Sequence, residues 1–536
     1  MTFAIDRRLL LKAATLGIGA LAVPGAAQLL SARGFTHAVA SGEPGAREAM
    51  LWTRYVPDAG DAARLVWQVS ADPDFGRLTA EGETVAAGER DWCAKALAGG
   101  LAPGGWYYYR FLDAAGRPSP VGRTRTLPDG PVARFGLGVF SCSNLPFGHF
   151  NAYAHAAGRS DLDLMVHLGD YIYEYPVGTY PGAGQAVAGR DILPDHETVA
   201  LADYRLRYAA YRSDPDLQRL HQLFPFVIMW DDHESANDAW KGGAENHQPE
   251  TEGPWDARKA AAVRAWREWM PVSDDMFRSY RIGDLAVLHR PETRLTARDR
   301  PPQLGEILRG GGDPAAALAA FRDGAWRDPA RTILGPEQER RLAEGFRAPA
   351  RWHVLAQQVV VGSLAFSPRM RDWTPAHAPA EIRQQAAIVF AAAAAGLPFN
   401  FDAWDGYPAA RERLLRSALD ADASLVTLSG DSHNGWAFNL DLGGTPAGVD
   451  FGVQSVTSPG LEAYAARDPA EVAAALVAHN PQLAWADTSR RGYMSLTLTP
   501  ERAVNEWHFL ETVRQRRTAL SGSHRAEVAR GANRIA

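Results

Sequence analysis

Apolar and polar residues alternate along this chain in two different patterns. Residues 34–129 contain brief runs with a period of two, for example residues 65–69 and 106–111, separated by turn residues. This alternation predicts half-buried strands. From residue 132 onward, continuous apolar runs alternate with longer helical patterns. This second pattern favours an α/β fold built on buried strands.

The change of hydrophobic pattern near residue 130 predicts two domains. We expect an all-β sandwich over residues 34–130, similar in length to an immunoglobulin or fibronectin domain, and an α/β domain over residues 131–536. Helices are expected over residues 201–223, 257–269, 315–321, 336–346 and 409–419, and a β-hairpin over residues 494–509. The polar, arginine-rich end of the chain is interpreted as a C-terminal helical tail.

Residues 1–33 resemble an export signal. Arg7 and Arg8 precede a modest alanine-rich apolar stretch that ends near Ala27, as in twin-arginine signal peptides. The stretch is too short to span a bilayer well, and an amphipathic helix of the mature domain is the alternative interpretation. We therefore expect export by the twin-arginine machinery to the periplasm or the extracellular space, and no transmembrane segment.

Composition narrows the possible partners. The chain has 62 acidic and 56 basic residues and a formal net charge of -6, which argues against nucleic-acid binding as a main role. A phosphate-bearing substrate is not excluded, because bound cations would reverse the local field. Several of the 16 tryptophans lie near the polar clusters described next. Core packing is the expected role of these rings, and walls of a substrate pocket are the alternative.

Four of the apolar runs end in residue types that bind metals. Cys142 follows residues 135–140, Asp170 and Tyr173 follow residues 162–168, Asp232 and His233 follow residues 226–230, and Asp431 and His433 follow residues 425–428. In open α/β sheets, ligands lie beyond the carboxyl ends of the strands. These side chains are therefore expected to meet in one polynuclear metal site.

The residue types suggest individual roles. Asp170 is expected to bridge two cations, and Tyr173, as a charge-donating phenolate, favours a trivalent ion such as Fe³⁺. Tyr171 and Tyr175 are better explained by packing. Cys142 is expected to be a ligand because it directly follows a strand, and a disulfide between Cys93 and Cys142 is the alternative.

The acidic stretch after the third run combines metal-binding and orienting residue types. Two adjacent carboxylates would repel each other if they were buried without a cation. We expect Asp232 on the metal and His233 near the substrate, with Asp231 and Glu234 holding His233 in one tautomer. An ordinary acidic helix start is the alternative. After the fourth run, Asp431 and His433 are expected to point the same way on extended backbone.

Together, these motifs resemble those of PhoD-type alkaline phosphatases, a branch of the metallophosphoesterases. The matching stretches include Ser141-Cys142-Ser143-Asn144, Gly169-Asp170-Tyr171-Ile172-Tyr173-Glu174, Trp230-Asp231-Asp232-His233-Glu234, Trp404-Asp405-Gly406-Tyr407 and Gly430-Asp431-Ser432-His433-Asn434. The resemblance extends over nearly the whole chain after the signal, and the series is highly specific as a set.

The resemblance implies a four-layer α/β/β/α catalytic domain and hydrolysis of small phosphoesters, chiefly monoesters with some diesters, by a metal-activated hydroxide. It implies Fe³⁺ held by Cys142, Asp170 and Tyr173. It also implies Ca²⁺ held by Asp170, Asp232, Asp431 and His433, and places Asn434 at the metal or the phosphate. His233 would protonate the leaving oxygen or orient the substrate.

One motif departs from the family pattern. The family often has Leu-Asp-Thr-Arg where this chain has Pro291-Glu292-Thr293-Arg294. Arg294 is the candidate phosphate contact through its planar fork of donors, and a surface salt bridge is the alternative. Two rival functions are a phospholipase D-like phosphodiesterase on the same site and a non-catalytic cell-envelope binding protein with structural metals.

Overall fold

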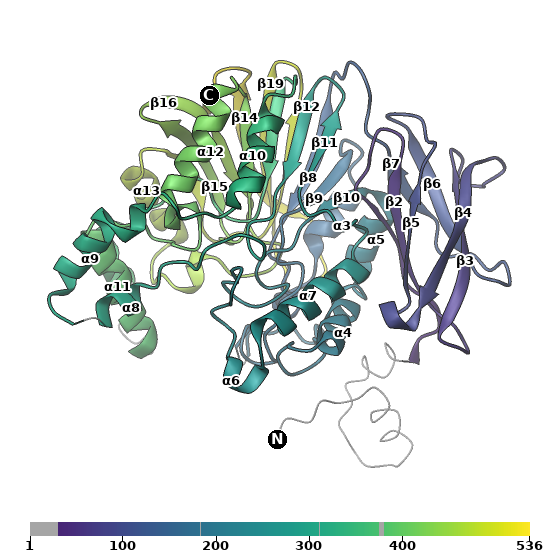
Figure 1. Ribbon diagram of the computed structural model, residues 1–536, viewed down its shortest axis with the longest axis horizontal. Helices are drawn as coiled ribbons and strands as arrows, with labels where there is room; N and C mark the ends of the chain where they lie inside the picture. The colour runs from purple at the N-terminus through teal and green to yellow at the C-terminus, as the bar shows by residue number, and fades with distance from the viewer. Residues whose placement is uncertain (1–30, 183, 310, 375–379) are drawn as a thin grey trace, which may run out of the picture.

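The computed structural model describes residues 31–182, 184–309, 311–374 and 380–536. The twin-arginine segment, with Arg7, Arg8 and the expected cleavage site near Ala27, lies outside the described residues. Three sheets and the helices around them make up the described part of the chain, as Figure 1 shows.

The N-terminal region is a two-layer β-sandwich, as the alternating pattern predicted. Its outer sheet has the order β4 (Leu78–Ala87), β3 (Ala62–Ser70), β6 (Trp106–Leu112) and β7 (Gly122–Arg125). Alternate residues of β6 are buried, and they face a second layer made of β1 (Gly34–Gly42), β2 (Ala49–Val56) and β5 (Cys93–Ala98). Leu51, Val69 and Phe111 lie in the core between the layers.

The inner layer of the sandwich continues into the main sheet of the α/β region. β1 pairs in parallel with β10 (Pro225–Ile228), with Ser41 opposite Pro225 and Gly42 opposite Phe226. The resulting nine-stranded sheet has the order β20-β19-β18-β8-β9-β10-β1-β2-β5. The two predicted regions therefore share backbone hydrogen bonds across their boundary. The change of hydrophobic pattern near residue 130 did not indicate this pairing.

Glu43 joins the two regions electrostatically. Its carboxylate accepts hydrogen bonds from Arg290 Nη1 at 2.9 Å, Arg278 Nη1 at 2.6 Å and Ser273 N at 2.9 Å, and the side chain is buried. Burial acts to raise the pKa of Glu43, but Arg290 and the other partners lower it below its ordinary value. Glu43 is therefore a buried ion-pair partner shared by both regions.

We expect Glu43→Gln to lower the free energy of unfolding at pH 7 by about 3 kcal/mol, because breaking a buried pair leaves the charge of Arg290 uncompensated. Urea unfolding followed by tryptophan fluorescence measures the change. Glu83→Gln is the control, because Glu83 pairs with Arg64 on the surface, and its loss should cost under about 1 kcal/mol. Equal effects of the two substitutions would contradict the role given to Glu43.

Two sheets packed face to face form the centre of the α/β region. The remaining strands of the nine-stranded sheet are β8 (Phe135–Phe140), β9 (Leu164–His167), β18 (Gly492–Leu498), β19 (Arg502–Leu510) and β20 (Leu520–Ala529). The seven-stranded sheet has the order β11 (Arg278–Ile282), β12 (Ala286–Arg290), β13 (Trp352–Ala356), β14 (Leu425–Ser429), β16 (Thr445–Gly452), β15 (Gly435–Leu442) and β17 (Leu483–Asp487). Val139, Val354 and Leu428 lie in the core between the sheets.

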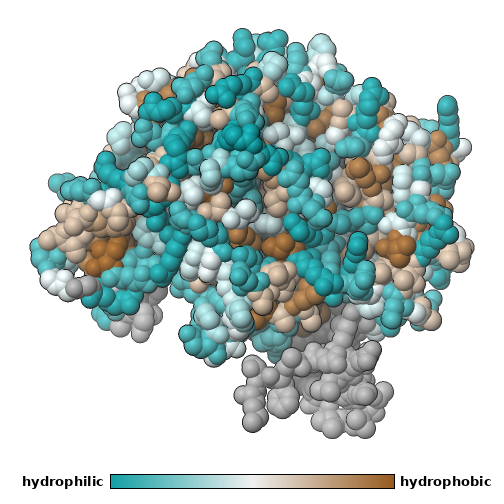
Figure 2. Space-filling view, viewed as in Figure 1, coloured by the Kyte–Doolittle hydropathy of each residue, from teal (hydrophilic) through white to brown (hydrophobic). Residues whose placement is uncertain are grey.

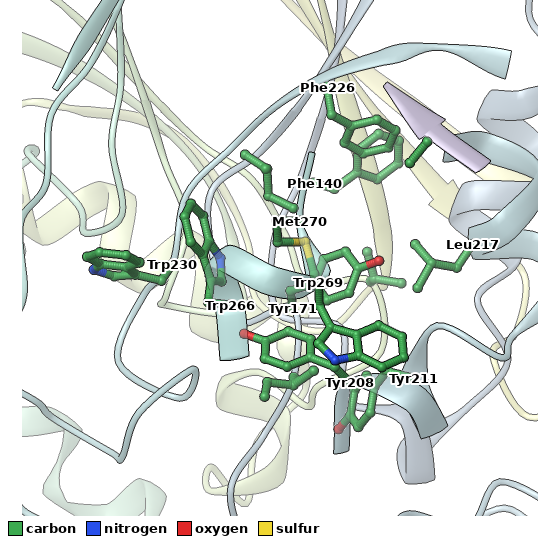
Figure 3. Close-up of a cluster of buried hydrophobic side chains, with 14 of the residues drawn as sticks. Phe140, Tyr171, Tyr208, Tyr211, Leu217, Phe226, Trp230, Trp266, Trp269 and Met270 are labelled. Atoms are coloured by element: carbon green, nitrogen blue, oxygen red, sulfur yellow. The ribbon is translucent and has the colours of Figure 1, made fainter. Parts of the chain in front are cut away.

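Helices cover the outer face of each sheet. The first set, α3 (Asn151–Ala157), α4 (Leu201–Tyr211), α5 (Pro215–Leu223) and α7 (Trp255–Trp269), packs on the nine-stranded sheet. Figure 3 shows the aromatic side chains Tyr208, Trp266 and Trp269 of these helices packed near Phe140 and Phe226 of the strands. The second set, α10 (Gly335–Phe346), α12 (Pro408–Asp420) and α13 (Pro469–His479), packs on the seven-stranded sheet. The predicted four-layer α/β/β/α architecture is confirmed.

A small helical group projects from the side of the seven-stranded sheet, at the left of Figure 1. It contains α8 (Leu304–Arg309), α9 (Pro314–Asp323) and α11 (Ala380–Ala394), and Leu318, Ala392 and Phe401 form its own core. α6 (Pro249–Glu252) is a single turn elsewhere on the surface. In the space-filling view of Figure 2, the visible face of the molecule is mostly hydrophilic, with small separate apolar areas.

Two predictions of secondary structure are wrong. Residues 201–223 form two helices, because Pro215 cannot continue the first and Asp214 caps the second, accepting from Asp216 N at 2.9 Å and Leu217 N at 3.0 Å. The C-terminal helical tail is instead strand β20, paired antiparallel with β19. Ala526 and Val528 are buried, whereas their neighbours in the strand are exposed or half-buried, and both enter the core between the sheets. This period of two outweighs the arginine-rich composition.

Candidate metal centre

The ends of four buried strands meet at one site. β8 leads to Cys142, β9 to Asp170, β10 to Asp232, and β14, from the other sheet, to Asp431 and His433. Three groups of side chains have ligand atoms within 4.8 Å of one another: Cys142, Asp170 and His433; Asp170, Asp232 and His233; and Asp231, Asp232 and Asp431. Asp170 and Asp232 each belong to two groups, so the side chains meet in one place as predicted, and their binding of several cations stays a prediction.

The backbone turns sharply where it presents these ligands. Cys142, Asp170, Asp431 and His433 have φ values of 59°, 55°, 62° and 64°, in the left-handed region that non-glycine residues rarely adopt. The expected extended backbone at Asp431 and His433 is therefore wrong. Non-glycine residues in this region carry strain of about 1–3 kcal/mol each and cluster at functional sites.

Two glycines allow the strand ends to approach each other. A Cβ atom on Gly169 would lie 2.4 Å from the Cβ of Asp231, and a Cβ on Gly430 would lie 2.3 Å from Ser141 Oγ. Any larger residue at either position would push one strand end away from its neighbour. Glu234 then joins β9 to β10, because it accepts from Tyr171 N at 2.6 Å and Asp231 N at 2.7 Å.

The first group offers sulfur, carboxylate and imidazole donors, and the phenol of Tyr173 lies beside it. Tyr173 Oη donates to Asp170 Oδ2 at 3.0 Å and lies 3.4 Å from His433 Nε2. His433 Nδ1 is 2.8 Å from the carbonyl oxygen of Pro459, which directs Nε2 towards the group, as in metal-ligating histidines. The resemblance assigned His433 to the Ca²⁺ ligands, but the structure places it with Cys142 and Tyr173.

Cys142 does not form the disulfide with Cys93 that was the alternative to metal binding. Cys93 and Cys142 are both buried and free, and Cys93 belongs to strand β5 of the sandwich. Burial, together with the nearby charge of Asp170, raises the pKa of the Cys142 thiol well above its ordinary value. A cation beside the sulfur would reverse this effect and favour the thiolate.

The third group is a dense cluster of carboxylates around one arginine. Arg294 Nη2 donates to Asp431 Oδ1 at 3.0 Å, its Nε donates to Asp231, and its Nη1 donates to Asp402. Asp232 Oδ1 lies 3.7 Å from Arg294 Nη2. The guanidinium is fully buried, and these carboxylates raise its pKa although burial acts to lower it.

One of the two predictions for Arg294, the surface salt bridge, needs correction, and the phosphate contact stays a prediction. The side chain is not on the surface, so the salt bridge is a buried network. All three guanidinium nitrogens already donate to aspartates, so Arg294 acts as an internal counter-charge and holds the carboxylates in place. Arg298 extends the network, because its Nη2 also donates to Asp402.

His233 is held by a residue that the sequence analysis did not assign. Its Nδ1 lies 2.7 Å from Glu174 Oε2, whereas Asp231 and Glu234 bond Arg294 and backbone amides, so the tautomer role expected of them is wrong. Burial lowers the pKa of His233, but Asp232, Glu174 and Asp170 together raise it well above its ordinary value. His233 also lies within ligand distance of Asp170 and Asp232.

Asn434 lies beside the centre, but its side chain is bound to the backbone. Its Nδ2 donates to the carbonyl oxygen of Ser432, and its Oδ1 accepts from Leu461 N at 3.1 Å. These bonds tie the loop after β14 to the segment that begins at Leu461. In this arrangement the amide positions the loop that carries Asp431 and His433.

The site carries more negative charge than its own side chains balance. Asp170 Oδ1, Asp231 Oδ2 and Asp232 Oδ1 are buried and have no hydrogen-bond partner among the described residues. Burial, with neighbouring carboxylates, raises the pKa of Asp170 well above its ordinary value and that of Asp431 to about 7, despite the opposing charge of Arg294 at Asp431. Buried oxygens without partners and mutually repelling carboxylates fit a cation site.

Glu174, Asp402 and Ser458 also belong to the site, but the sequence analysis assigned them no role. Glu174 could have been noticed, because it directly follows Tyr173 in the same motif. Asp402 and Ser458 gave no comparable signal, since each comes from a loop far along the chain. Asp402 bonds Arg294, and Ser458 Oγ donates to Tyr173 Oη at 2.8 Å.

Comparison with known proteins agrees with this geometry. The PhoD-like phosphatase family matches residues 137–507, and the N-terminal domain of PhoD-like phosphatases matches residues 21–128. Alkaline phosphatase D of Bacillus subtilis (strain 168) is 32% identical over 532 residues, which cover 94% of this chain and 82% of that protein. A solved structure of PhoD has a TM-score of 0.75 and 28% identity, covering 94% of this chain and 92% of that chain. The chain therefore belongs to the PhoD-like phosphatase family and is a hydrolase of phosphoric ester bonds.

Proposed function

We propose that this enzyme is an exported, metal-dependent phosphatase that hydrolyses small phosphomonoesters, with some activity on diesters. The observation that carries the proposal is that thiol, carboxylate and imidazole groups from four strand ends form three overlapping groups. Within each group the ligand atoms lie within 4.8 Å of one another, and the phenol of Tyr173 lies beside the first. Such mixed donors, with buried oxygens that lack partners, suit a polynuclear site at which a phosphoryl group is held and attacked.

The donor types support Fe³⁺ and Ca²⁺ as the cations. Cys142, Asp170 and Tyr173 would hold Fe³⁺, and His433 lies with them. The carboxylates of Asp232 and Asp431, with Asp170 shared, would hold Ca²⁺, which prefers oxygen ligands. When bound, such cations polarise phosphoryl oxygens and lower the pKa of water.

The chain's own residues would then complete the reaction. His233, fixed through Nδ1 by Glu174, would present Nε2 to the substrate and protonate the departing ester oxygen. Arg294 would keep Asp231 and Asp431 in register beneath the phosphoryl group. Asp232 is held in turn by the amide of Asp238, which donates to Asp232 Oδ2 at 2.7 Å.

Export would follow the twin-arginine route to the periplasm or beyond the cell, as Arg7 and Arg8 suggest. Among the described residues, no helix combines the length and apolar character needed to cross a membrane. A phospholipase D-like phosphodiesterase would use the same residues and remains the rival substrate class. A purely structural metal protein does not fit membership of a phosphatase family.

Metal removal tests the proposal. Chelation of the purified protein should lower the hydrolysis of p-nitrophenyl phosphate about 100-fold or more, because several kcal/mol of charge stabilisation disappear. Elemental analysis before and after chelation should show iron and calcium in the active form, and their return should restore the rate. Bis-p-nitrophenyl phosphate and a phospholipid, assayed in parallel, separate the monoesterase from its rivals. Full activity in a metal-free sample would refute metal dependence.

A further inference from the structure

A cavity of about 230 Å³ opens directly beside the candidate metal centre. At one end it is lined by Asp431, His433 and Asn434, which follow strand β14. The rest of the wall is mostly apolar and includes Leu364, Phe399, Trp436, Phe438 and Tyr464. A group bonded to a phosphate at the metal centre could therefore extend into an apolar compartment.

The inner wall of the cavity is firmly built. Trp436 and Phe438 are buried residues of strand β15, and Trp436 Nε1 donates to Ser432 Oγ at 2.8 Å. This bond ties the wall to the loop between the two expected ligands Asp431 and His433. Gly362 leaves room for the ring of Phe438, because a Cβ there would lie 2.2 Å from it.

The outer rim has a different character. Tyr464 is 55% exposed, and it follows the short helical turn Leu461–Ala463, whose first amide is held by Asn434. Tyr464 thus presents an aromatic ring at the mouth of a cavity whose back wall is also aromatic. An exposed aromatic ring of this kind offers contact area to a ligand without disturbing the core.

Charge and size favour an apolar occupant. Among the described residues, no lysine or arginine lines the cavity, whereas Asp405 and Asp431 do. The carboxylate of Asp405 accepts from Leu364 N at 2.9 Å, so it belongs to the wall itself. An anionic group would meet the carboxylate of Asp405 with no lysine or arginine in the lining to compensate it. A cavity of about 150 Å³ is enough for one benzene ring, so this one can hold an aryl or short alkyl group.

We propose that this cavity receives the alcohol part of the phosphoester and makes the enzyme selective for apolar aryl and alkyl phosphates over those with an anionic substituent. The proposal rests on the proposed phosphatase function. Water displaces the alcohol at phosphorus, the ester P–O bond breaks, and the alcohol takes up a proton and leaves through the mouth beside Tyr464.

The test is a series of alkyl phosphates with similar leaving groups. With the metal-loaded enzyme, kcat/KM should be at least about tenfold higher for butyl phosphate than for methyl phosphate, because each buried methylene contributes about threefold or more. Propyl phosphate should exceed 2-carboxyethyl phosphate, which is similar in size but anionic, by about tenfold or more. Release of inorganic phosphate measures all four rates.

Variants of the rim separate a cavity effect from general reactivity. Tyr464→Ala should lower the butyl-to-methyl ratio of kcat/KM about fivefold, whereas Tyr464→Phe should keep it within about twofold, because the ring supplies the apolar area. Leu97→Ala is the control at an equally exposed apolar residue (54%) far away on β5, and it should leave the ratio unchanged.

The possible failures are distinct. Equal rates along the alkyl series, with p-nitrophenyl phosphate still hydrolysed, would overturn the cavity assignment and leave the phosphatase function standing. A ratio unaffected by Tyr464→Ala would likewise overturn it. No hydrolysis of any phosphate by the metal-loaded enzyme would overturn the proposed function together with the inference.

Discussion

Asp170→Asn should lower the kcat for p-nitrophenyl phosphate by about 10³-fold or more, while the protein remains folded. Asp170 is one of the two carboxylates that belong to two of the three ligand groups, and its Oδ1 has no hydrogen-bond partner among the described residues. A neutral amide would bind cations weakly, and the charge stabilisation of the transition state would be lost with them. Steady-state kinetics and the metal content of the purified variant measure the two effects.

The fold should tolerate this substitution. Asparagine adopts left-handed backbone readily, so the φ of 55° at residue 170 is preserved, and the amide oxygen can still accept from Tyr173. Removing one of several mutually repelling carboxylates should also leave the metal-free variant at least as stable as the metal-free wild type. Asp422→Asn is the matched control, because Asp422 also has a positive φ of 50° and is exposed. Wild-type activity in Asp170→Asn would remove Asp170 from the site.

Arg294→Met should destabilise the metal-free protein by about 3–5 kcal/mol, because its buried guanidinium faces four aspartates. All of them except Asp402, which also pairs with Arg298, would lose their counter-charge. Added Ca²⁺ should recover part of this loss, since a cation that binds only the folded state stabilises it. Thermal unfolding in chelator and in Ca²⁺ gives both values. The same variant should also lose most of its activity, because Asp231 and Asp431 would no longer be held apart by a common donor.

The matched control is Arg340→Met, an exposed arginine of α10 that pairs with Glu337 and Glu344. Its effect should stay below about 1 kcal/mol in either condition. If Arg294→Met were as stable as the wild type in chelator, Arg294 would not be the counter-charge of the cluster. If Ca²⁺ stabilised neither the variant nor the wild type, the carboxylates around Arg294 would not be a cation site.

The strand ends were predictable because a strand that is buried on both faces is a continuous apolar run in the sequence. β8, β9, β10 and β14 are buried at every position, since each lies between two packed layers, and apart from Thr427 their polar residues come where the chain leaves the core. The ligand types at these ends, with the rule that sites form at the carboxyl edge of such sheets, were enough to predict which side chains meet.

The partners of those side chains were not predictable in the same way. Glu174 hydrogen-bonds to His233, and Asp402 accepts a hydrogen bond from Arg294, although the two residues of each pair are far apart in the sequence. Local sequence also misled at the C-terminus, where an arginine-rich segment became β20 because an unpaired edge at β19 was available to it. The continuation of β1 beside β10 likewise depends on a neighbour that appears more than 180 residues later.

By itself, the sequence determined the all-β and α/β character of the two regions and the identity of the side chains that meet at the candidate metal centre, because periodicity and residue type are local properties of the chain. Only the tertiary structure decided how those side chains are grouped, that Arg294 neutralises carboxylates from inside, and that an apolar cavity adjoins the site. These features depend on distances between segments from different sheets, and such distances are set by packing rather than by any one stretch of residues.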